Sequence, residues 1–88
     1  MALDITIVGP DGRELDMGTG FDDLSERSHP ALELVMLERG EITEQQVDNR
    51  RLLREAMFRA GFFGINSEWW HFDCGDRVLV RQTCARVL

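Results

Sequence analysis

The sequence contains no lysine and no tyrosine, and its basic residues are 10 arginines against 16 acidic residues. The formal net charge of −6 argues against nucleic-acid binding, because contacts to phosphates need clustered Lys and Arg. No apolar run approaches the ~20 residues needed to cross a membrane, and the N-terminus lacks the pattern of a signal peptide. We therefore expect a cytoplasmic protein with neither nucleic-acid nor membrane partners.

Cysteine is also scarce, with only Cys74 and Cys84 present. Two cysteines do not make the disulfide framework of a small secreted domain. They can pair with each other or remain ordinary thiols. A cytoplasmic location favours reduced thiols.

The length of 88 residues allows one small domain, which we place over residues 1–88. A domain of this size buries only about 60–65% of the surface of its unfolded chain, so its margin of stability is thin. The hydrophobic content of 43% is ordinary for a globular protein and does not indicate disorder.

The N-terminal part of the chain has the pattern of a hairpin followed by a loop. The β-branched residues between Leu3 and Val8 predict a strand. Pro10-Asp11-Gly12 predicts a turn, and Arg13–Leu15 a short returning arm. Glycines and acids over residues 18–23 then predict a loop whose backbone a substrate can approach closely.

Two helices are expected in the middle of the chain. Ser28, followed after one residue by a proline, predicts the N-cap of a short helix that ends at Gly40. Thr43 and Gln46 have the spacing of a capping box at the start of a second helix. Gly61 follows that helix in the position where a left-handed residue is favoured.

The second helix is expected to be amphipathic. Its apolar stripe is interpreted as core and contains Leu53, Ala56, Met57 and Ala60. Its arginines are interpreted mostly as a solvated face: Arg50, Arg51, Arg54 and Arg59.

Strands at Glu68–Asp73 and Val78–Arg81 are expected to form a second hairpin. Two hairpins and one well-marked helix predict the α+β class, with a small antiparallel sheet covered by one main helix.

The segment Ser67–Asp73 holds the residues best suited to chemistry: an acid, both tryptophans and one of the two histidines. Histidine is a common metal ligand, and a Glu beside a metal-bound water can act as a general base. Adjacent tryptophans form an apolar wall that excludes water. The same residues also fit a buried aromatic strand with one satisfied histidine and a surface Glu, and composition alone favours this structural interpretation.

The motif Glu68-Trp69-Trp70-His71-Phe72 resembles the signature of the zinc D-alanyl-D-alanine dipeptidases of the VanX type. Further segments resemble the same family in the same order: Ala2–Thr6, Met17–Asp22, Glu26–His29, Asn49–Arg54 and Gly61-Phe62. The similarity extends from Ala2 to about Arg81. It implies the C-terminal portion of a dipeptidase domain, with the hedgehog/DD-peptidase fold and without the N-terminal half.

The resemblance also implies roles for individual residues. Asp4 and His71 would bind Zn²⁺, and Glu68 would be the catalytic general base. Asp22 would receive the free amino group of the dipeptide. Residues i and i+3 of a regular strand face opposite sides, so Glu68 and His71 can act together only at a twist, bulge or strand end. Without the family match, Asp4 reads as a strand-end acid and Asp22 as a loop acid.

The other aromatic and histidine residues are given structural roles. Trp69 and Trp70 are expected to pack the wall of the site and the core rather than to contact substrate. His29 matches the family but has no metal role in it, so we expect it to hold the loop by hydrogen bonds.

The chain departs from the family at its start. The family's first zinc histidine belongs to a Ser-x-His-x-x-Gly-x-x-x-Asp arrangement, and counting back from Asp4 places it upstream of Met1. The family's transition-state arginine is missing as well. Two protein ligands rarely hold a catalytic zinc, which leaves three hypotheses open.

In the first hypothesis, the chain is the catalytic part of a dipeptidase that hydrolyses D-alanyl-D-alanine, a precursor of peptidoglycan, when an N-terminal segment or self-association completes it. Such activity serves either glycopeptide resistance or cell-wall recycling. In the second, it is a zinc-binding module completed by His29 or Cys74. In the third, it is a non-catalytic fragment.

Overall fold

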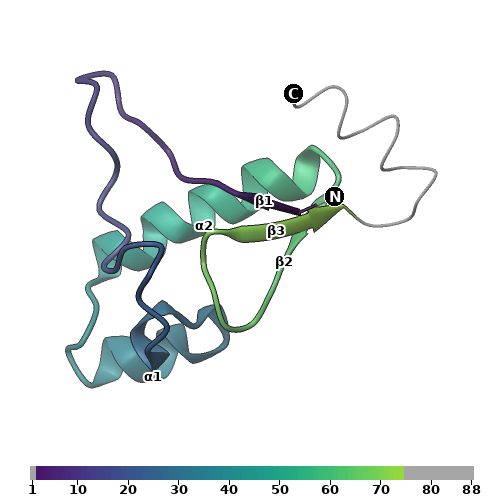
Figure 1. The fold of residues 1–88 in the computed structure, drawn as a ribbon. Coiled ribbons are helices and arrows are strands. Elements are labelled where there is room, and N and C mark those ends of the chain that lie inside the picture. The colour runs from purple at the N-terminus through teal and green to yellow at the C-terminus, as the bar shows by residue number, and fades with distance from the viewer. Residues whose placement is uncertain (1, 75–88) are drawn as a thin grey trace.

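The computed structural model describes residues 2–74. Its elements in chain order are β1 (Ala2–Asp4), the short 3₁₀ helices η1 (Glu26–Ser28) and η2 (Pro30–Leu32), α1 (Glu33–Glu38), α2 (Glu44–Arg59), β2 (Phe62–Gly64) and β3 (His71–Cys74) (Figure 1). The α+β class and the small antiparallel sheet are therefore confirmed.

The sheet has three strands in the order β1-β3-β2, and both pairings are antiparallel. The first and last described parts of the chain thus lie side by side. The register places Asp4 opposite His71 and Leu3 opposite Phe72. The expected strand at Val78–Arg81 lies outside the described residues.

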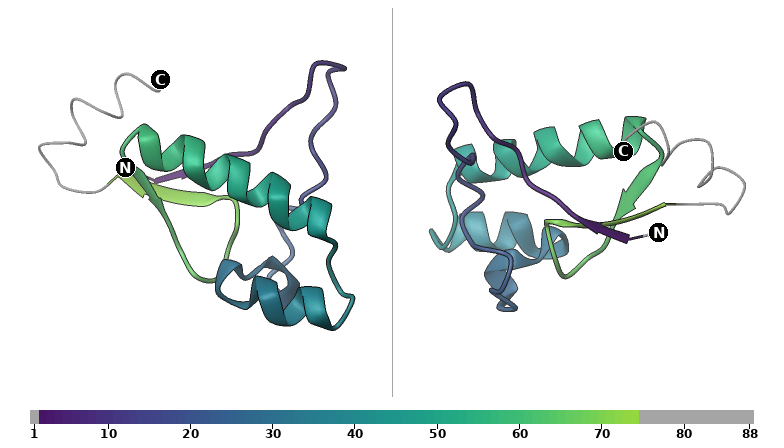
Figure 2. Two further views of the ribbon diagram at one scale, coloured as in Figure 1. Left: turned by 180° about the vertical axis from the view of Figure 1, so that it is seen from behind. Right: turned by 45° about the horizontal axis from the view of Figure 1, so that its top comes forward.

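The main core lies between this sheet and α2, the long helix that runs along one side of it (Figures 1 and 2). Side chains of a strand alternate between its two faces, and Leu3 and Phe72 share the face that packs into the core. Asp4 and His71 consequently share the opposite face. The buried hydrophobic residues of this cluster are Met17, Leu53, Met57, Phe62, Trp69, Trp70 and Phe72.

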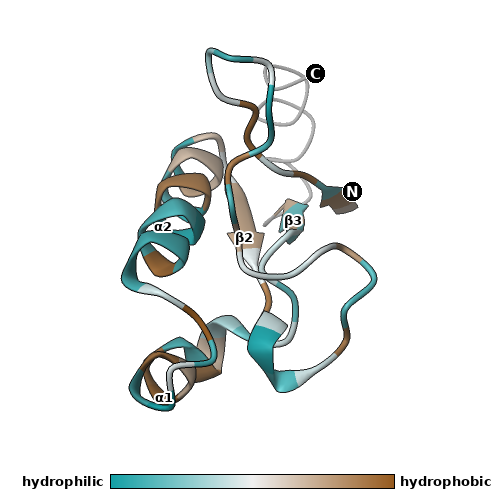
Figure 3. Ribbon diagram, turned by 90° about the vertical axis from the view of Figure 1, so that its left-hand side faces the viewer, coloured by the Kyte–Doolittle hydropathy of each residue, from teal (hydrophilic) through white to brown (hydrophobic). Residues whose placement is uncertain are grey.

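A second, smaller cluster joins α1 to the start of α2 and contains Met36, Ile42 and Val47. Figure 3 shows apolar and polar segments alternating along both helices. Leu53 and Met57 confirm the apolar stripe predicted for α2, whereas Ala56 is exposed.

Three of the four predicted helix ends are confirmed: those marked by Thr43, Gly40 and Gly61. The Thr43 hydroxyl accepts from the Gln46 backbone N–H at 3.2 Å, and the Gln46 side chain accepts from the Thr43 backbone N–H at 2.8 Å. Gly40 follows α1 with φ 73°, and Gly61 follows α2 with φ 90°. Both glycines supply the left-handed conformation that ends a helix.

The first predicted strand is shorter than expected. β1 ends at Asp4 because its partner β3 begins at His71, and one further bond joins the Ile5 N–H to the Trp70 C=O at 2.9 Å. The predicted turn is present: the Gly9 N–H donates to the Arg13 C=O at 2.7 Å, beyond an isolated bridge between Val8 and Glu14.

The prediction that Ser28 caps a helix is wrong. Ser28 is fully buried within η1, and its hydroxyl donates to the Asp23 C=O instead. The chain reaches α1 through η2, which starts at Pro30 and has no side-chain cap.

The arginine face of α2 is solvated only in part. Arg51 and Arg59 are exposed as predicted, but Arg50 is only 1% exposed. Its guanidinium contacts Glu33 and two backbone carbonyls, which compensate for the lost water. Burial lowers the pKa of Arg50, and the nearby Glu33 carboxylate opposes that effect.

Two further expectations concern cysteine and membranes. Cys74 is disulfide-bonded, so the expectation of a reduced thiol is wrong for this residue, and Cys84 lies outside the described residues. Within residues 2–74, no helix has the length and apolar character needed to span a membrane.

Candidate active site

The Asp4 and His71 side chains meet on the face of the sheet that points away from α2. Their strands pair in a register that sets the two residues directly opposite each other. The Asp4 Oδ1 atom lies 2.9 Å from His71 Nδ1, a hydrogen-bonding distance. The His71 side chain is 25% exposed and that of Asp4 55%, so solvent reaches both. The structure therefore brings together the two residues predicted as metal ligands.

Acidic groups surround the His71 ring. The hydrogen bond with Asp4 raises the pKa of His71 most, and the negative charges of Asp73, Asp4 and Glu68 add to it, while desolvation works in the opposite direction. The Nε2 atom lies 3.5 Å from Asp73 Oδ1, at the outer limit of a hydrogen bond. These acidic neighbours favour the protonated form of the His71 ring.

The strand predicted over Glu68–Asp73 begins three residues later than expected, at His71, because a turn at Trp69 and Trp70 precedes it. Glu68 therefore lies ahead of β3 and outside the strand. The strand end that the sequence required for Glu68 and His71 to act together is therefore present. Glu68 is partly buried, and its charge contributes to the pKa of His71. Its carboxylate forms no hydrogen bond or ion pair with another residue of the described segment, which leaves it available to an incoming molecule.

The two tryptophans that precede β3 belong to the hydrophobic core, as expected. Both are buried, and their rings meet edge to face with centroids 5.4 Å apart. Phe21, from the loop before η1, packs against both, with its ring centroid 5.7 Å from each. A loop distant in sequence is thus held against the segment between Glu68 and His71.

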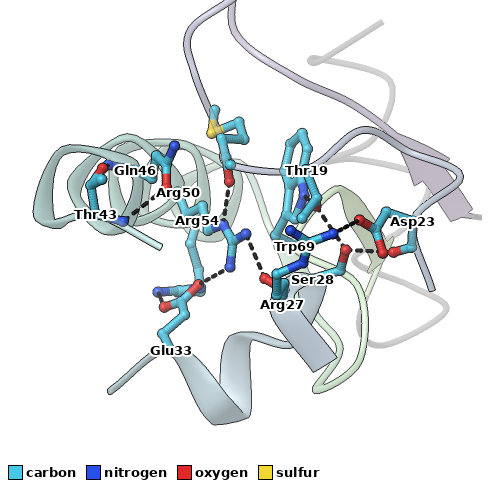
Figure 4. Close-up of polar contacts among 12 residues, drawn as sticks. Thr19, Asp23, Arg27, Ser28, Glu33, Thr43, Gln46, Arg50, Arg54 and Trp69 are labelled. Carbon is cyan, nitrogen blue, oxygen red and sulfur yellow. Dashed lines mark hydrogen bonds and ion pairs between the residues drawn. The ribbon is translucent and has the colours of Figure 1, made fainter. Parts of the chain in front are cut away.

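A chain of hydrogen bonds fixes this loop to Trp69 (Figure 4). The indole N–H donates to Thr19 Oγ1 at 2.9 Å, and Thr19 Oγ1 lies 2.7 Å from Ser28 Oγ. The Ser28 hydroxyl donates its single proton to the Asp23 C=O, so the Thr19 hydroxyl is the donor to Ser28.

Asp22 lies in the same loop, directly after Phe21, and is exposed. Its carboxylate makes no hydrogen bond or ion pair within residues 2–74. The contacts of Phe21 bring the loop to the two tryptophans, but no hydrogen bond or ion pair joins Asp22 to Asp4, Glu68 or His71. The loop presents a carboxylate that is free to pair with a cationic group.

An open pocket of about 150 Å³ lies beside this loop. Its lining residues are Thr6, Glu14, Leu15, Met17, Thr19, Gly20, Phe21 and Trp69. Two of its lining residues, Phe21 and Trp69, are next in sequence to Asp22 and Glu68, but none of the predicted site residues lines the pocket.

The donor set suits zinc in type but is incomplete in number. An imidazole and a carboxylate are common zinc ligands, whereas a catalytic zinc usually has three protein ligands. Residues 2–74 contain no group of three or more His, Cys, Asp or Glu side chains that could hold a metal ion. Neither His29 nor Cys74 therefore completes a three-ligand cluster with Asp4 and His71.

His29 does not have the role expected of it. Its backbone takes part in two turns: the His29 N–H donates to the Glu26 C=O, and the His29 C=O accepts from the Leu32 N–H, each at 3.0 Å. Its imidazole makes no hydrogen bond to another described residue. The polar side chains that do hold the loop are Thr19, Ser28, Asn49 and Arg50, to which the sequence analysis gave no such role.

The comparisons with known proteins agree with the motif. A family model described as "D-ala-D-ala dipeptidase" matches residues 1–87. D-alanyl-D-alanine dipeptidase of Escherichia coli (strain K12) is 42% identical over 72 residues, which cover 82% of this chain. Proteins of the same name from Synechocystis sp. (strain ATCC 27184 / PCC 6803 / Kazusa) and Enterococcus faecium are 40% and 39% identical, over 92% and 85% of the chain.

In all three cases the matched part makes up 34% of the relative's own length, so the chain spans about a third of the curated proteins it resembles. The match nevertheless covers nearly all of the present sequence, including both strands that carry Asp4 and His71. The chain belongs to the D-Ala-D-Ala dipeptidase family.

Proposed function

We propose that this chain provides the catalytic face of a zinc metallopeptidase that hydrolyses D-alanyl-D-alanine. The observation that carries the proposal is the juxtaposition of Asp4 and His71 across the β1–β3 pairing, 2.9 Å apart on a solvent-accessible face, with Glu68 just ahead of β3. The names of the relatives supply the substrate. We further propose that the sheet and α2 correspond to the C-terminal part of the hedgehog/DD-peptidase fold.

Asp4 and His71 would hold Zn²⁺ together with a third ligand from outside residues 2–74. A bound zinc ion supplies a water of lowered pKa and polarises a carbonyl group. Asp73 stands next to His71 Nε2 and favours a proton on that nitrogen. The Nδ1 atom, which faces Asp4, would then offer its lone pair to the metal.

Glu68 would be the general base that accepts a proton from the attacking water and later gives it to the leaving amine. Its carboxylate has no partner among the described residues, as this role requires. Asp22 would pair with the free ammonium group of the dipeptide through a charge-assisted hydrogen bond. Trp69 and Trp70 would keep water out of the site and so strengthen these charge interactions.

The missing third ligand favours a site that is completed by another segment, either an N-terminal part of a longer protein or a second copy. The complete enzyme would act in the cytoplasm and reduce the supply of D-alanyl-D-alanine for peptidoglycan, in resistance to glycopeptides or in recycling of the cell wall. The competing proposal is a non-catalytic fragment, which the lack of a three-ligand cluster within residues 2–74 supports. A zinc-binding module is the other alternative, and it would also need a ligand from outside those residues.

The test begins with a zinc titration of the wild-type chain and of His71→Ala, Asp4→Asn and Glu68→Ala variants. Binding that is lost in the first two variants and kept in the third identifies the ligands and separates them from the base. The same proteins are then assayed for hydrolysis of D-alanyl-D-alanine, alone and with the N-terminal region of a relative supplied in trans. Hydrolysis that requires Glu68 supports the enzyme. If the chain binds zinc but hydrolyses nothing, alone or with the N-terminal region, the result supports the zinc-binding module. If it binds no zinc under either condition, the result supports the non-catalytic fragment.

A further inference from the structure

The guanidinium of Arg50 is buried and joins three separate parts of the chain. Its Nε donates to the Met17 C=O and its Nη2 to the Arg27 C=O, both at 2.7 Å, while Nη1 lies 3.5 Å from Glu33 Oε2 (Figure 4). A buried charge is costly unless it is paired and hydrogen-bonded. An arginine exposed on the surface of α2 would not lose its hydration and would avoid this cost.

The two carbonyls that Arg50 binds stand at the two ends of one loop. We call residues 17–27 the Asp22 loop. Its residues 18–25 belong to no helix or strand, so the path of the backbone depends on contacts with side chains. A single planar guanidinium with several fixed N–H donors can hold both ends at once.

The start of the Asp22 loop lies directly on α2. Gly18 has φ 90°, and a Cβ atom there would lie 3.0 Å from Gln46 Oε1 and 3.4 Å from Arg50 Nη2. Asn49 Nδ2 donates to the Asp16 C=O at 2.9 Å, and Gln46 Nε2 donates to Asp16 Oδ2 at 3.0 Å. One polar face of α2 therefore fixes the point at which the loop begins.

Near its start, the loop is also fixed to the segment before β3. The hydrogen bonds from Trp69 through Thr19 to Ser28 tie it to the segment that contains Glu68 and His71. Asp22 stands between these anchors and makes no polar contact of its own within the described residues. Its position is consequently set by its neighbours.

We propose that Arg50 is a positioning residue: by holding both ends of the Asp22 loop, it sets the place of the Asp22 carboxylate relative to Glu68 and His71, and thereby the preference for a substrate with a free ammonium group. The inference rests on the proposed function, of which ammonium recognition by Asp22 is a part. A carboxylate–ammonium pair depends on its geometry, so a displaced loop loses selectivity before the fold is lost.

Arg54 provides a matched control on the same helix. Its Nη2 lies 2.9 Å from Glu33 Oε1, so it pairs with the same acid as Arg50, yet its hydrogen bonds within the described residues go to Glu33 and not to the loop. Arg50→Lys keeps the positive charge but loses the planar fork that reaches two carbonyls. Arg54→Lys makes the same chemical change without touching the loop.

The experiment compares the wild-type chain with these two variants in two measurements. The first is hydrogen exchange of the backbone amides of the Asp22 loop and of α2. The second is the ratio of the dissociation constants of D-alanyl-D-alanine and N-acetyl-D-alanyl-D-alanine, measured by calorimetry in the presence of zinc. In Arg50→Lys we expect loop amides to exchange roughly tenfold or more faster, α2 amides to be unchanged, and the selectivity ratio to fall toward one. Arg54→Lys should match the wild type in both measurements.

The proposal would be overturned if the loop amides of Arg50→Lys exchanged at the wild-type rate. It would also be overturned if they exchanged faster and the selectivity ratio stayed at the wild-type value. Equal acceleration of the loop and α2 would show a purely structural role and overturn it as well. If Arg50→Lys does not fold, Thr19→Val releases the same loop from Trp69. Wild-type selectivity in that variant would show that the position of the loop does not set the selectivity, and would overturn the proposal. The dissociation constants are measured without and with the N-terminal region of a relative supplied in trans. Failure of the wild type to bind either dipeptide in both cases counts against the proposed function, and hydrogen exchange of the loop then decides by itself whether Arg50 holds the loop.

Discussion

The Asp4 carboxylate and the His71 imidazole lie 2.9 Å apart although 67 positions separate them in the chain. Antiparallel pairing of two short strands creates this contact, since each residue is the direct partner of the other in the register. The face they share is accessible to solvent, whereas Leu3 and Phe72 beside them pack into the core. The candidate site and the core therefore lie on opposite faces of the β1–β3 pair.

Replacing Asp4 should lower the pKa of His71. The hydrogen bond with Asp4 is the largest cause of the raised pKa, so Asp4→Asn should move it back toward the ordinary value of 6.5. Asp73→Asn should have a smaller effect, because Asp73 lies 3.5 Å from the ring. NMR titration of the His71 ring protons measures both, with His29 as the internal reference. An Asp4→Asn variant with an unchanged His71 pKa would contradict the contact.

The stability of the metal-free chain should fall as the pH rises above 6.5 and through the folded-state pKa of His71. The folded state holds the pKa of His71 above its unfolded value of 6.5, so the folded state binds the proton more tightly. The resulting stabilisation is fully present below pH 6.5 and is lost as the pH rises through the folded-state pKa. Urea unfolding between pH 5.5 and pH 8.5 with a chelator present measures the change. In Asp4→Asn the free energy of unfolding should depend less on pH than in the wild type. The same pH dependence in both proteins would contradict the attribution of this effect to the Asp4–His71 contact.

Local patterns in the sequence predicted much of the fold. The capping box at Thr43, the glycine after α2 and the strand containing His71 follow from the nearest neighbours of each residue, so the prediction could use them directly. The burial of Arg50 could not be predicted in this way, because its partners Met17 and Arg27 come from a loop without secondary structure. Tertiary contacts, rather than the helix pattern, decide which arginine of α2 is buried.

In the candidate site, too, local motifs could be predicted from the sequence, whereas contacts between distant residues could not. The identities of Glu68 and His71 came from a compact motif, and their placement at a strand end agrees with what the motif requires. The pairing of Asp4 with His71 came from family resemblance, because nothing local links residues so far apart in sequence. The hydrogen bonds of Thr19 and Ser28 were missed since hydroxyl groups in a loop carry no periodic signal.

Adjacent leucines on α2 test the position of the core. Leu53 is 3% exposed and Leu52 is 54% exposed. Leu53→Ala should lower the free energy of unfolding by about 2–5 kcal/mol, because it leaves a cavity between α2 and the sheet. Leu52→Ala should change it by less than about 0.5 kcal/mol. Urea denaturation of the two variants gives both values. Similar losses in the two variants would contradict the orientation of the helix.

The hydroxyl of Thr19 should matter more than its methyl group. Thr19→Val keeps the shape of the side chain but leaves the buried Trp69 N–H without its acceptor and removes the donor to Ser28. An unsatisfied buried group costs about 1–3 kcal/mol, and we expect a loss of stability in that range. Thr19→Ser restores the hydroxyl and should recover most of it. The indole N–H resonance of Trp69 provides a local measurement: it should exchange faster with solvent in Thr19→Val and at nearly the wild-type rate in Thr19→Ser. Equal exchange in the two variants would show that the Trp69–Thr19 bond does not hold the loop against the site.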